Sequence, residues 1–262
     1  MSLLGETAKI LYKTGLCRFF SIQQQGFKLK YFPTKMSKRL WITAIQKKSP
    51  YKVLDEFFIR HLKQGDIVID AGANIGYYSL LSAAAVGASG YVYAIEAHPK
   101  TYSYLQKNIN FNKFENIQCF HTALGNESGD IKFSNKDSDD LNQVDSAGDI
   151  SVPIIRLDDL PIPDSRINLL KVDVEGYEKF VMQGAANLLT RTNVILFESW
   201  DDHYRKFDYS LTDILAYLSS YGFLFMTYNA NGFSEIEKDY SSLECEDIVA
   251  VRDIKQFLEN LA

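Results

Sequence analysis

The sequence predicts an α/β fold in which a mostly parallel sheet of seven strands is flanked by helices. Two observations predict it. Short apolar runs, which suit strands buried on both faces of a sheet, alternate with helical segments from residue 51 onward. Acidic residues come directly after several of these runs, where the carboxyl ends of parallel strands would meet. Both features are typical of open α/β sheets, which bind ligands at that edge of the sheet.

The stretch 66–76, DIVIDAGANIG, carries the strongest local signal. Its β-branched apolar run ends at Asp70, and a helix rich in Ala and Leu is expected over 77–86. Gly72 and Gly76 bracket the turn between them, where glycine permits close approach of another group. A strand, a glycine turn and a helix N-terminus with unpaired N–H groups form a unit that opens nucleotide-type sites.

The turn departs from the dinucleotide pattern G-x-G-x-x-G, because Asp70 lies two residues before the first glycine. A carboxylate at that position would repel a pyrophosphate but suits a ligand that carries positive charge. S-adenosylmethionine (SAM) has a sulfonium and an ammonium group beside one carboxylate, so it could use both the acid and the N–H donors. The alternative is a glycine turn in an α/β domain that binds no such ligand.

A second strand is expected over 91–96, and it ends at Glu96, 20 residues beyond Gly76. An acid at this point can accept two hydrogen bonds from a ribose diol. The alternative is a surface acid or a helix-capping partner. The next helix is expected over 101–111. Pro99 lies at its start, the position in a helix that proline favours.

A third strand is expected over 117–121, followed by Thr122 and Ala123. In this architecture the loop after the third strand lies beside adenine, where backbone groups can contact the ring edge. The run 134–149 is acidic, rich in Ser, Asn and Asp, and poor in apolar anchors. It is expected to be a mobile loop, either a lid over the substrate or a disordered segment.

Two more acids follow predicted strands. Asp173 comes after 169–172 and Glu198 after 194–197, so both would project from neighbouring strand ends toward the rim that carries Glu96. The tail supplies the remaining elements of a seven-stranded sheet, namely a helix over 211–218 and strands over 223–227 and 248–252.

These motifs, in this order, resemble the FkbM family of SAM-dependent methyltransferases, within the Rossmann-like class I fold. The resemblance covers roughly residues 50–230. It is carried by residues 68–76, by Glu96 with Pro99, by residues 157–160 and 171–178, and by Glu198. Family members often have a histidine shortly after the acid of the fifth strand, whereas the first histidine here is His203.

The resemblance implies transfer of a methyl group from SAM to a hydroxyl of a sugar, a glycan or a natural product. The residues that it assigns to SAM are Asp70, Gly72, Asn74 and Gly76 around the methionine part and ribose, Glu96 on the ribose diol, and Thr122 and Ala123 beside adenine. An alcohol is a poor nucleophile until a base removes its proton. Asp173 is the first candidate for that base, and His203 is the second because imidazole titrates near neutral pH.

Asp173 and Glu198 are also candidate ligands of a Mg²⁺ ion, which would lower the pKa of the acceptor hydroxyl. The alternatives are that Asp173 only orients SAM or substrate and that Glu198 hydrogen-bonds a loop. His203 could equally be a surface residue.

Two other classes of function stay open. A nicotinamide-dependent oxidoreductase could have the same fold, although the turn sequence and Asp70 disfavour it. The other class is a catalytically silent module that retains SAM or has lost it. Binding of SAM against NAD, and conversion of SAM to S-adenosylhomocysteine, would separate the three.

The chain length suits one large α/β domain, expected over 51–262, with a small N-terminal cap or arm over 1–50. Residues 1–52 contain eleven Lys or Arg and one acid, so a basic arm precedes an acidic body within a net charge of −5. Such an arm could contact a membrane surface, nucleic acid or an acidic substrate. The preferred interpretation is a solvated basic face that packs on the domain.

Three dispersed cysteines form no metal-ligand spacing and leave an odd thiol, which favours a reducing cytoplasm. No stretch has the length of a transmembrane helix, and the N-terminus lacks a signal-peptide core. As the family resemblance implies, a small-molecule or glycan acceptor is expected as the partner, and nucleic acid is not. The sequence carries no sign of the oligomeric state.

Overall fold

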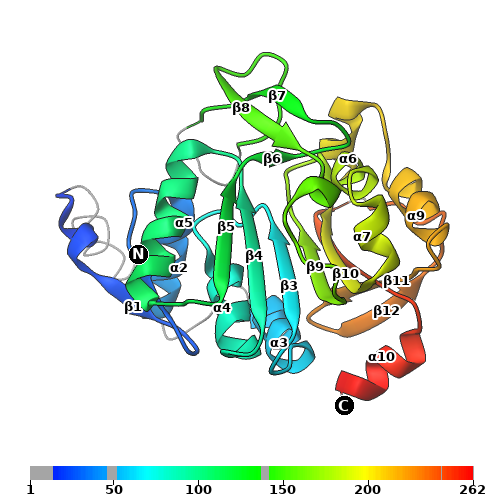
Figure 1. Ribbon diagram of the computed structural model, residues 1–262, viewed down its shortest axis with the longest axis horizontal. Helices are drawn as coiled ribbons and strands as arrows, with labels where there is room; N and C mark the ends of the chain where they lie inside the picture. Colours follow the sequence, from blue (N-terminus) through cyan, green and yellow to red (C-terminus); the bar gives the residue numbers. More distant parts are fainter. Residues whose placement is uncertain (1–13, 46–51, 137–141, 243, 262) are drawn as a thin grey trace.

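The main sheet has eight strands in the order β12-β11-β13-β10-β9-β3-β4-β5 (Figure 1). The computed structural model describes residues 14–45, 52–136, 142–242 and 244–261. The strands are β3 (Ile67–Ala71), β4 (Tyr91–Glu96), β5 (Ile117–His121), β9 (Ile167–Val172), β10 (Thr192–Ser199), β11 (Leu224–Asn229), β12 (Gly232–Ile236) and β13 (Glu246–Val251). Strands β5, β4, β3, β9 and β10 pair in parallel, whereas β13, β11 and β12 join through antiparallel pairs. The expected α/β fold with a mostly parallel sheet is confirmed.

The sheet has one strand more than the seven expected. β12 returns antiparallel to β11, with Tyr228 opposite Phe233 and Asn229 opposite Gly232. The residues of β12 are exposed or half-buried. A strand at the edge of a sheet needs only one neighbour, so its sequence GFSEI has no apolar run that would predict it.

Helices cover both faces of the sheet because successive residues of each strand point to opposite sides. Val68 of β3 packs in the apolar layer under α3, α4 and α5, while Ile69 packs in the layer under α6, α7 and α9. The helices are α3 (Lys52–His61), α4 (Tyr77–Val86), α5 (Pro99–Asn112), α6 (Glu178–Gln183), α7 (Ala186–Thr190), α8 (Asp201–Tyr204), α9 (Leu211–Ser219) and α10 (Ile254–Leu261), with short 3₁₀ turns η3 (Leu157–Asp159) and η4 (Arg205–Phe207). Among the described residues, no helix is both long and apolar enough to cross a membrane.

The described N-terminal residues pack on the face of the sheet that α3, α4 and α5 cover. They form η1 (Leu16–Phe19), a hairpin of β1 (Ser21–Gln23) and β2 (Lys28–Lys30), and α2 (Lys35–Ile45). Asn112 and Asn108 of α5 accept hydrogen bonds from the backbone N–H groups of Lys28 and Lys30, at 2.7 and 2.9 Å. Segment 39–45, whose sequence suits either a strand or a short helix, is helical. Apolar residues over 3–16 have the spacing of an amphipathic helix, and nearly all of that segment lies outside the described residues.

A second, three-stranded sheet lies over the carboxyl ends of the parallel strands, at the top of Figure 1. Its order is β6-β8-β7, formed by β6 (Ala123–Leu124), β8 (Ile150–Ile155) and β7 (Gly129–Phe133). The polar run expected as a mobile loop begins where β7 ends. Its two described ends are joined, because Ser134 N donates a hydrogen bond to Gln143 O at 3.0 Å. Residues 137–141 of that run lie outside the described residues.

Candidate functional site

A cavity of about 640 Å³ lies at the carboxyl ends of the parallel strands, a volume typical of small-molecule and cofactor sites. Most of the residues singled out in the sequence line it: Gly72, Asn74, Glu96, Thr122, Ala123, Asp173, Glu198 and His203. The structure therefore brings the expected cofactor residues and the expected acceptor residues into one cavity. Asp70 and Gly76 are not among the lining residues.

The glycines of the turn are required by packing within the protein. A Cβ atom on Gly72 would lie 1.8 Å from the carbonyl oxygen of Asp173, and the Gly72 φ of +81° also disfavours a side chain. The backbone N–H of Asp173 in turn donates to Ala71 O at 3.0 Å. A Cβ on Gly76 would lie 2.6 Å from a methyl carbon of Leu105. These contacts hold the ends of β3 and β9 together, so the turn and Asp173 face the same cavity.

Glu96 fastens the turn to the start of α5. Its Oε2 accepts a hydrogen bond from Asn74 N at 2.9 Å, and its Oε1 accepts one from His98 N at 2.8 Å. The residue is 8 % exposed and lines the cavity. A carboxylate that lines a cavity can also accept hydrogen bonds from donors of a bound ligand.

Asp70, for which the sequence predicts contact with the cofactor, is not among the residues that line the cavity. It is 1 % exposed, and its Oδ2 accepts a hydrogen bond of 2.5 Å from the hydroxyl of Ser79 in α4. Its Oδ1 lies 3.4 Å from Nζ of Lys171. The side chain points toward α4 and β9 because a buried carboxylate needs partners of this kind. Asp70 therefore acts on the site through Lys171.

Lys171 is a site residue that the sequence analysis did not single out. Its Nζ lies 3.1 Å from Oδ2 of Asp173 as well as 3.4 Å from Asp70, so one cation links the two acids. Burial alone would lower the pKa of Lys171, but the Asp173 and Asp70 carboxylates raise it above its usual value. The signal in the sequence is a lysine inside the apolar strand LLKV, since a buried charge must be paired.

The part of the cavity wall that β10 and β13 form is rich in carboxyl groups. Burial and the charge of Asp173 raise the pKa of Glu198 to about 8 and that of Asp247 to about 7. Glu198 Oε1 also accepts a hydrogen bond of 3.1 Å from the thiol of Cys245. Asp247 and Cys245, which the sequence analysis missed as site residues, come from β13 and the segment before it.

Glu178 supports this wall from inside the protein. Its Oε1 accepts hydrogen bonds from the N–H groups of Val174 at 3.0 Å and Gly176 at 3.2 Å, so it stabilises the turn after β9. Burial raises its pKa to about 7.

Thermal stability is expected to fall as the pH rises from 6 to 8. A carboxyl with a raised folded-state pKa keeps its proton in the folded protein while the unfolded chain ionises near pH 4.5. The contribution of this carboxyl to the free energy of unfolding is therefore complete below pH 4.5. It is lost as the pH rises through the pKa of the folded state, which is about 8 for Glu198. One such proton lowers the free energy of unfolding by about 1.4 kcal/mol per pH unit, which is roughly 3–6 °C in Tm.

Scanning calorimetry across this pH range tests the expectation, with Glu198→Gln as the matched variant. The variant cannot ionise at this position, so its Tm should depend less on pH. A wild-type Tm that rises between pH 6 and 8 would contradict the assignment.

His203 lines the cavity next to a further acid. Its Nδ1 lies 3.7 Å from Oε2 of Glu175, and its ring centroid lies 4.4 Å from that of Trp200. Burial, followed by the charge of Lys206, lowers the pKa of His203 below its usual 6.5. At neutral pH the imidazole is therefore uncharged and able to accept a proton.

The residues that converge closely enough for a metal ion differ from the pair suggested by the sequence. Among the described residues, ligand atoms of Glu175, Glu198 and His203 lie within 4.8 Å of one another. Asp173 is outside this group. Its Oδ2 is paired with Lys171.

The strand order, with antiparallel β13 inserted between β10 and β11, together with a cavity at the strand ends, defines a class I methyltransferase fold. The model of the methyltransferase FkbM domain matches residues 70–225, more than half of the chain. The chain belongs to this family. It is a SAM-dependent methyltransferase, which replaces the nicotinamide-dependent alternative.

Two curated relatives are similar in sequence. The hexuronic acid methyltransferase AglP of Haloferax volcanii is 25% identical over 195 residues, covering 72% of this chain and 78% of AglP. Methyltransferase 1 of Beauveria bassiana is 27% identical over 143 residues, covering 45% of this chain and 57% of the relative.

Solved structures show a similar but distant arrangement. The methyltransferase FkbM of Methylobacillus flagellatus is 14% identical with a TM-score of 0.48, covering 82% of this chain and 53% of that one. A SAM-dependent methyltransferase of Aquifex aeolicus is 18% identical with a TM-score of 0.47, covering 78% of this chain and 89% of that one.

Proposed function

We propose that this methyltransferase transfers the methyl group of SAM to a hydroxyl oxygen of a sugar, either free or within a glycan or natural product. The observation that carries the proposal is the placement of His203, an uncharged imidazole backed by Glu175, in the same cavity as the glycine turn and Glu96. Transfer to oxygen needs such a proton acceptor. The name of the Haloferax relative, a hexuronic acid methyltransferase, supports a sugar as the acceptor class.

The proposed cofactor contacts follow the lining of the cavity. The turn at Gly72 and Asn74 holds the methionine part of SAM, Glu96 accepts hydrogen bonds from the ribose diol, and Thr122 and Ala123 lie beside adenine. When bound, SAM supplies a methyl carbon made electrophilic by the sulfonium. The residues around it exclude water and hold the acceptor oxygen opposite the sulfur, which lowers the entropic part of the barrier.

In the proposed reaction the acceptor oxygen forms a bond to the methyl carbon as the carbon–sulfur bond breaks. The hydroxyl proton passes to the His203 imidazole, and the sulfur keeps the electron pair as the neutral thioether of S-adenosylhomocysteine. Glu175 stabilises the imidazolium. Asp173, which the sequence favoured as the base, is paired with Lys171 at 3.1 Å, so it is better suited to accept a hydrogen bond from the hydroxyl and orient it.

A metal-assisted reaction is a second candidate, favoured by the convergence of Glu175, Glu198 and His203. A divalent ion on these side chains would lower the pKa of the acceptor hydroxyl. The histidine suits a transition metal better than Mg²⁺, which prefers oxygen ligands. The Mg²⁺ site that the sequence suggests at Asp173 and Glu198 remains a proposal. Of these two residues, Glu198 belongs to the converging group of Glu175, Glu198 and His203.

Replacing Glu96 with alanine is expected to weaken SAM binding by about 10- to 100-fold, because hydrogen bonds to a charged group contribute roughly 1.5–3 kcal/mol. Isothermal titration calorimetry with SAM measures the loss. The SAM affinity of Glu96→Gln should lie between those of the wild type and Glu96→Ala, since the amide retains one acceptor oxygen.

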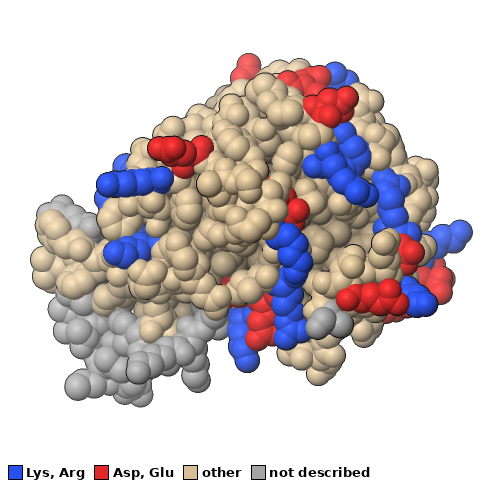
Figure 2. All heavy atoms as spheres, turned by 60° about the horizontal axis from the view of Figure 1, so that its bottom comes forward, with Lys and Arg blue, Asp and Glu red and all other residues tan. Residues whose placement is uncertain are grey.

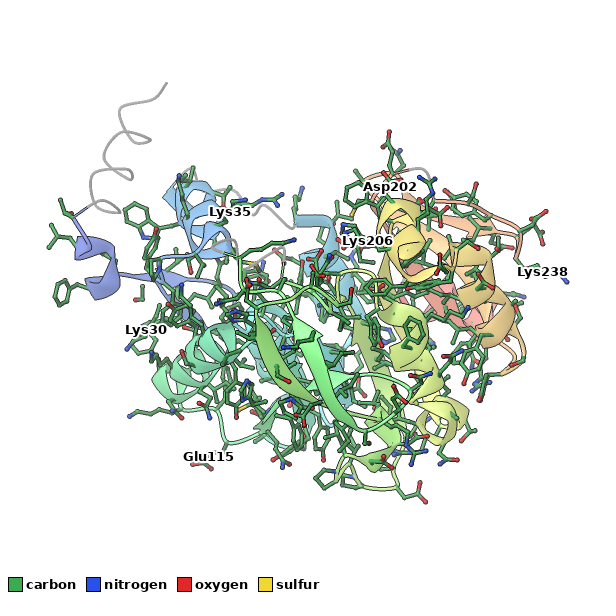
Figure 3. The ribbon with its side chains drawn as sticks, turned by 90° about the horizontal axis from the view of Figure 1, so that it is seen from above. Lys30, Lys35, Glu115, Asp202, Lys206 and Lys238 are labelled. Carbon is green, nitrogen blue, oxygen red and sulfur yellow. The ribbon has the colours of Figure 1, made fainter. Side chains whose placement is uncertain are left out.

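Glu115→Ala is the matched control, because Glu115 is an exposed acid at the far edge of the molecule in Figure 3. Circular dichroism checks that the turn held by Glu96 still folds. Wild-type affinity in Glu96→Ala would contradict the assignment to ribose.

A further inference from the structure

The cavity has a basic side as well as an acidic wall. Lys35, Met36 and Arg39 of α2 line it, although α2 precedes the segment 70–225 that matches the family model. Residues four positions apart lie on the same face of a helix, so Lys35 and Arg39 face the cavity together. Both residues are exposed.

The packing of α2 keeps this basic side in place. Leu40 and Trp41 are buried on the other side of the helix, in the same apolar core as α3 and α4. Phe32, just before α2, stacks on Tyr104 of α5 with ring centroids 4.2 Å apart. Ser37 Oγ accepts a hydrogen bond from Phe32 N at 3.2 Å, so the start of the helix is held to the preceding segment.

The charged side chains that line the two sides of the cavity differ, and the acidic side also holds Lys171, which is paired with Asp70 and Asp173. Four acids project from the turn after β9 and from β10 and β13, namely Asp173, Glu175, Glu198 and Asp247. The cations Lys35 and Arg39 come from α2. On the lower face of the molecule, by contrast, acidic and basic side chains lie next to one another (Figure 2). Figure 3, which looks down on the cavity edge of the sheet, shows Lys35 on α2 to the left of centre and Lys206 on η4 to its right.

This difference favours an acceptor with two different ends. A neutral hydroxyl can approach the acidic wall, where Asp173 can accept a hydrogen bond from it. An anionic group on the same sugar would be attracted to the basic side, where an arginine fork and a lysine suit a carboxylate or a phosphate. Such an acceptor would enter the cavity in one orientation.

We propose that Lys35 and Arg39 bind an anionic group of the sugar acceptor, a carboxylate as in a uronic acid or a phosphate, and thereby direct a ring hydroxyl toward the acidic wall. The inference rests on the proposed function, and it adds the substrate charge and the residues that select it.

Binding of sugars to the full-length protein saturated with S-adenosylhomocysteine tests the inference without turnover. Methyl glucuronoside and methyl glucoside differ only in the carboxylate, and glucose 6-phosphate tests a phosphate. The wild-type protein should bind at least one charged sugar about tenfold or more tightly than methyl glucoside. The charged sugar that binds identifies the source of the anionic group.

The variant Lys35→Gln/Arg39→Gln should lose this preference while its affinity for S-adenosylhomocysteine stays unchanged. Lys38→Gln, which removes one charge from α2 at a residue outside the cavity lining, should retain it. Equal binding of charged and neutral sugars, binding of none of them, an unchanged preference in the double variant, or an equal loss of S-adenosylhomocysteine would each overturn the inference. If the protein binds and methylates neutral sugars alone, the proposed function is supported and the inference about Lys35 and Arg39 is overturned.

Discussion

Replacing Lys171 with methionine is expected to destabilise the protein by about 3–5 kcal/mol, the usual cost of removing one partner from a buried ion pair. Methionine fills a similar space with an unbranched chain. It leaves Asp70, which is 1 % exposed, with the Ser79 hydroxyl as its remaining described hydrogen-bond donor. Asp173 loses the same cation. Urea unfolding at constant m-value measures the change.

Two further variants separate the stability cost of breaking the buried ion pair from the cost of replacing any lysine. Lys52→Met removes an exposed partner, 3.8 Å from Glu56, and should cost less than about 1 kcal/mol. Asp70→Asn/Lys171→Met removes both buried charges and should recover part of the stability. If Lys171→Met costs no more than Lys52→Met, the linkage of the two acids is not important for the fold.

The parallel part of the fold was predictable because each of its strands and helices has a local pattern of apolar residues. The apolar runs of β4 and β5 and the alanine-rich α4 have the bounds that local periodicity indicated. Glu96 was predictable as a site residue for a related reason, since an acid at the end of a parallel strand has a defined position at the edge of the sheet.

Contacts between distant segments were not predictable in this way. The register of β13 on β10 places Asp247 opposite Glu198, and no local pattern shows that β13 enters the sheet between β10 and β11. Lys171 lies in a strand sequence, and its buried partner Asp70 follows from the pairing of β3 with β9. The basic side of the cavity likewise depends on how α2 packs. The excess of basic residues in that segment is visible in the sequence, but its position beside the cavity is not.

The assignment of the base predicts the largest effect on turnover. His203→Asn is expected to lower kcat by about 10²- to 10⁴-fold, the usual contribution of a positioned general base, while SAM binding stays within about twofold of wild type. Asparagine keeps a polar side chain next to Glu175 but cannot accept the proton. Single-turnover methyl transfer to a hydroxylated sugar measures the change.

The pH profile separates the roles of His203 and Asp173. A base works in its deprotonated form, and the pKa of His203 is lowered from 6.5, so wild-type kcat/KM should fall on acidification only below about pH 6.5. His203→Asn should lose this acid limb. Asp173→Ala should also lose turnover and spare SAM binding, but its residual activity should keep the limb because the imidazole is still present.

A third measurement separates the base from a metal ligand, since His203 could serve as either. Turnover that survives a chelator supports His203 as the base, because the proton then passes to the imidazole itself. Turnover lost in chelator and restored by a divalent ion would assign Glu175, Glu198 and His203 to a metal site. Full turnover in His203→Asn, with the acid limb intact and no effect of chelator, would leave Asp173 as the base despite its pairing with Lys171.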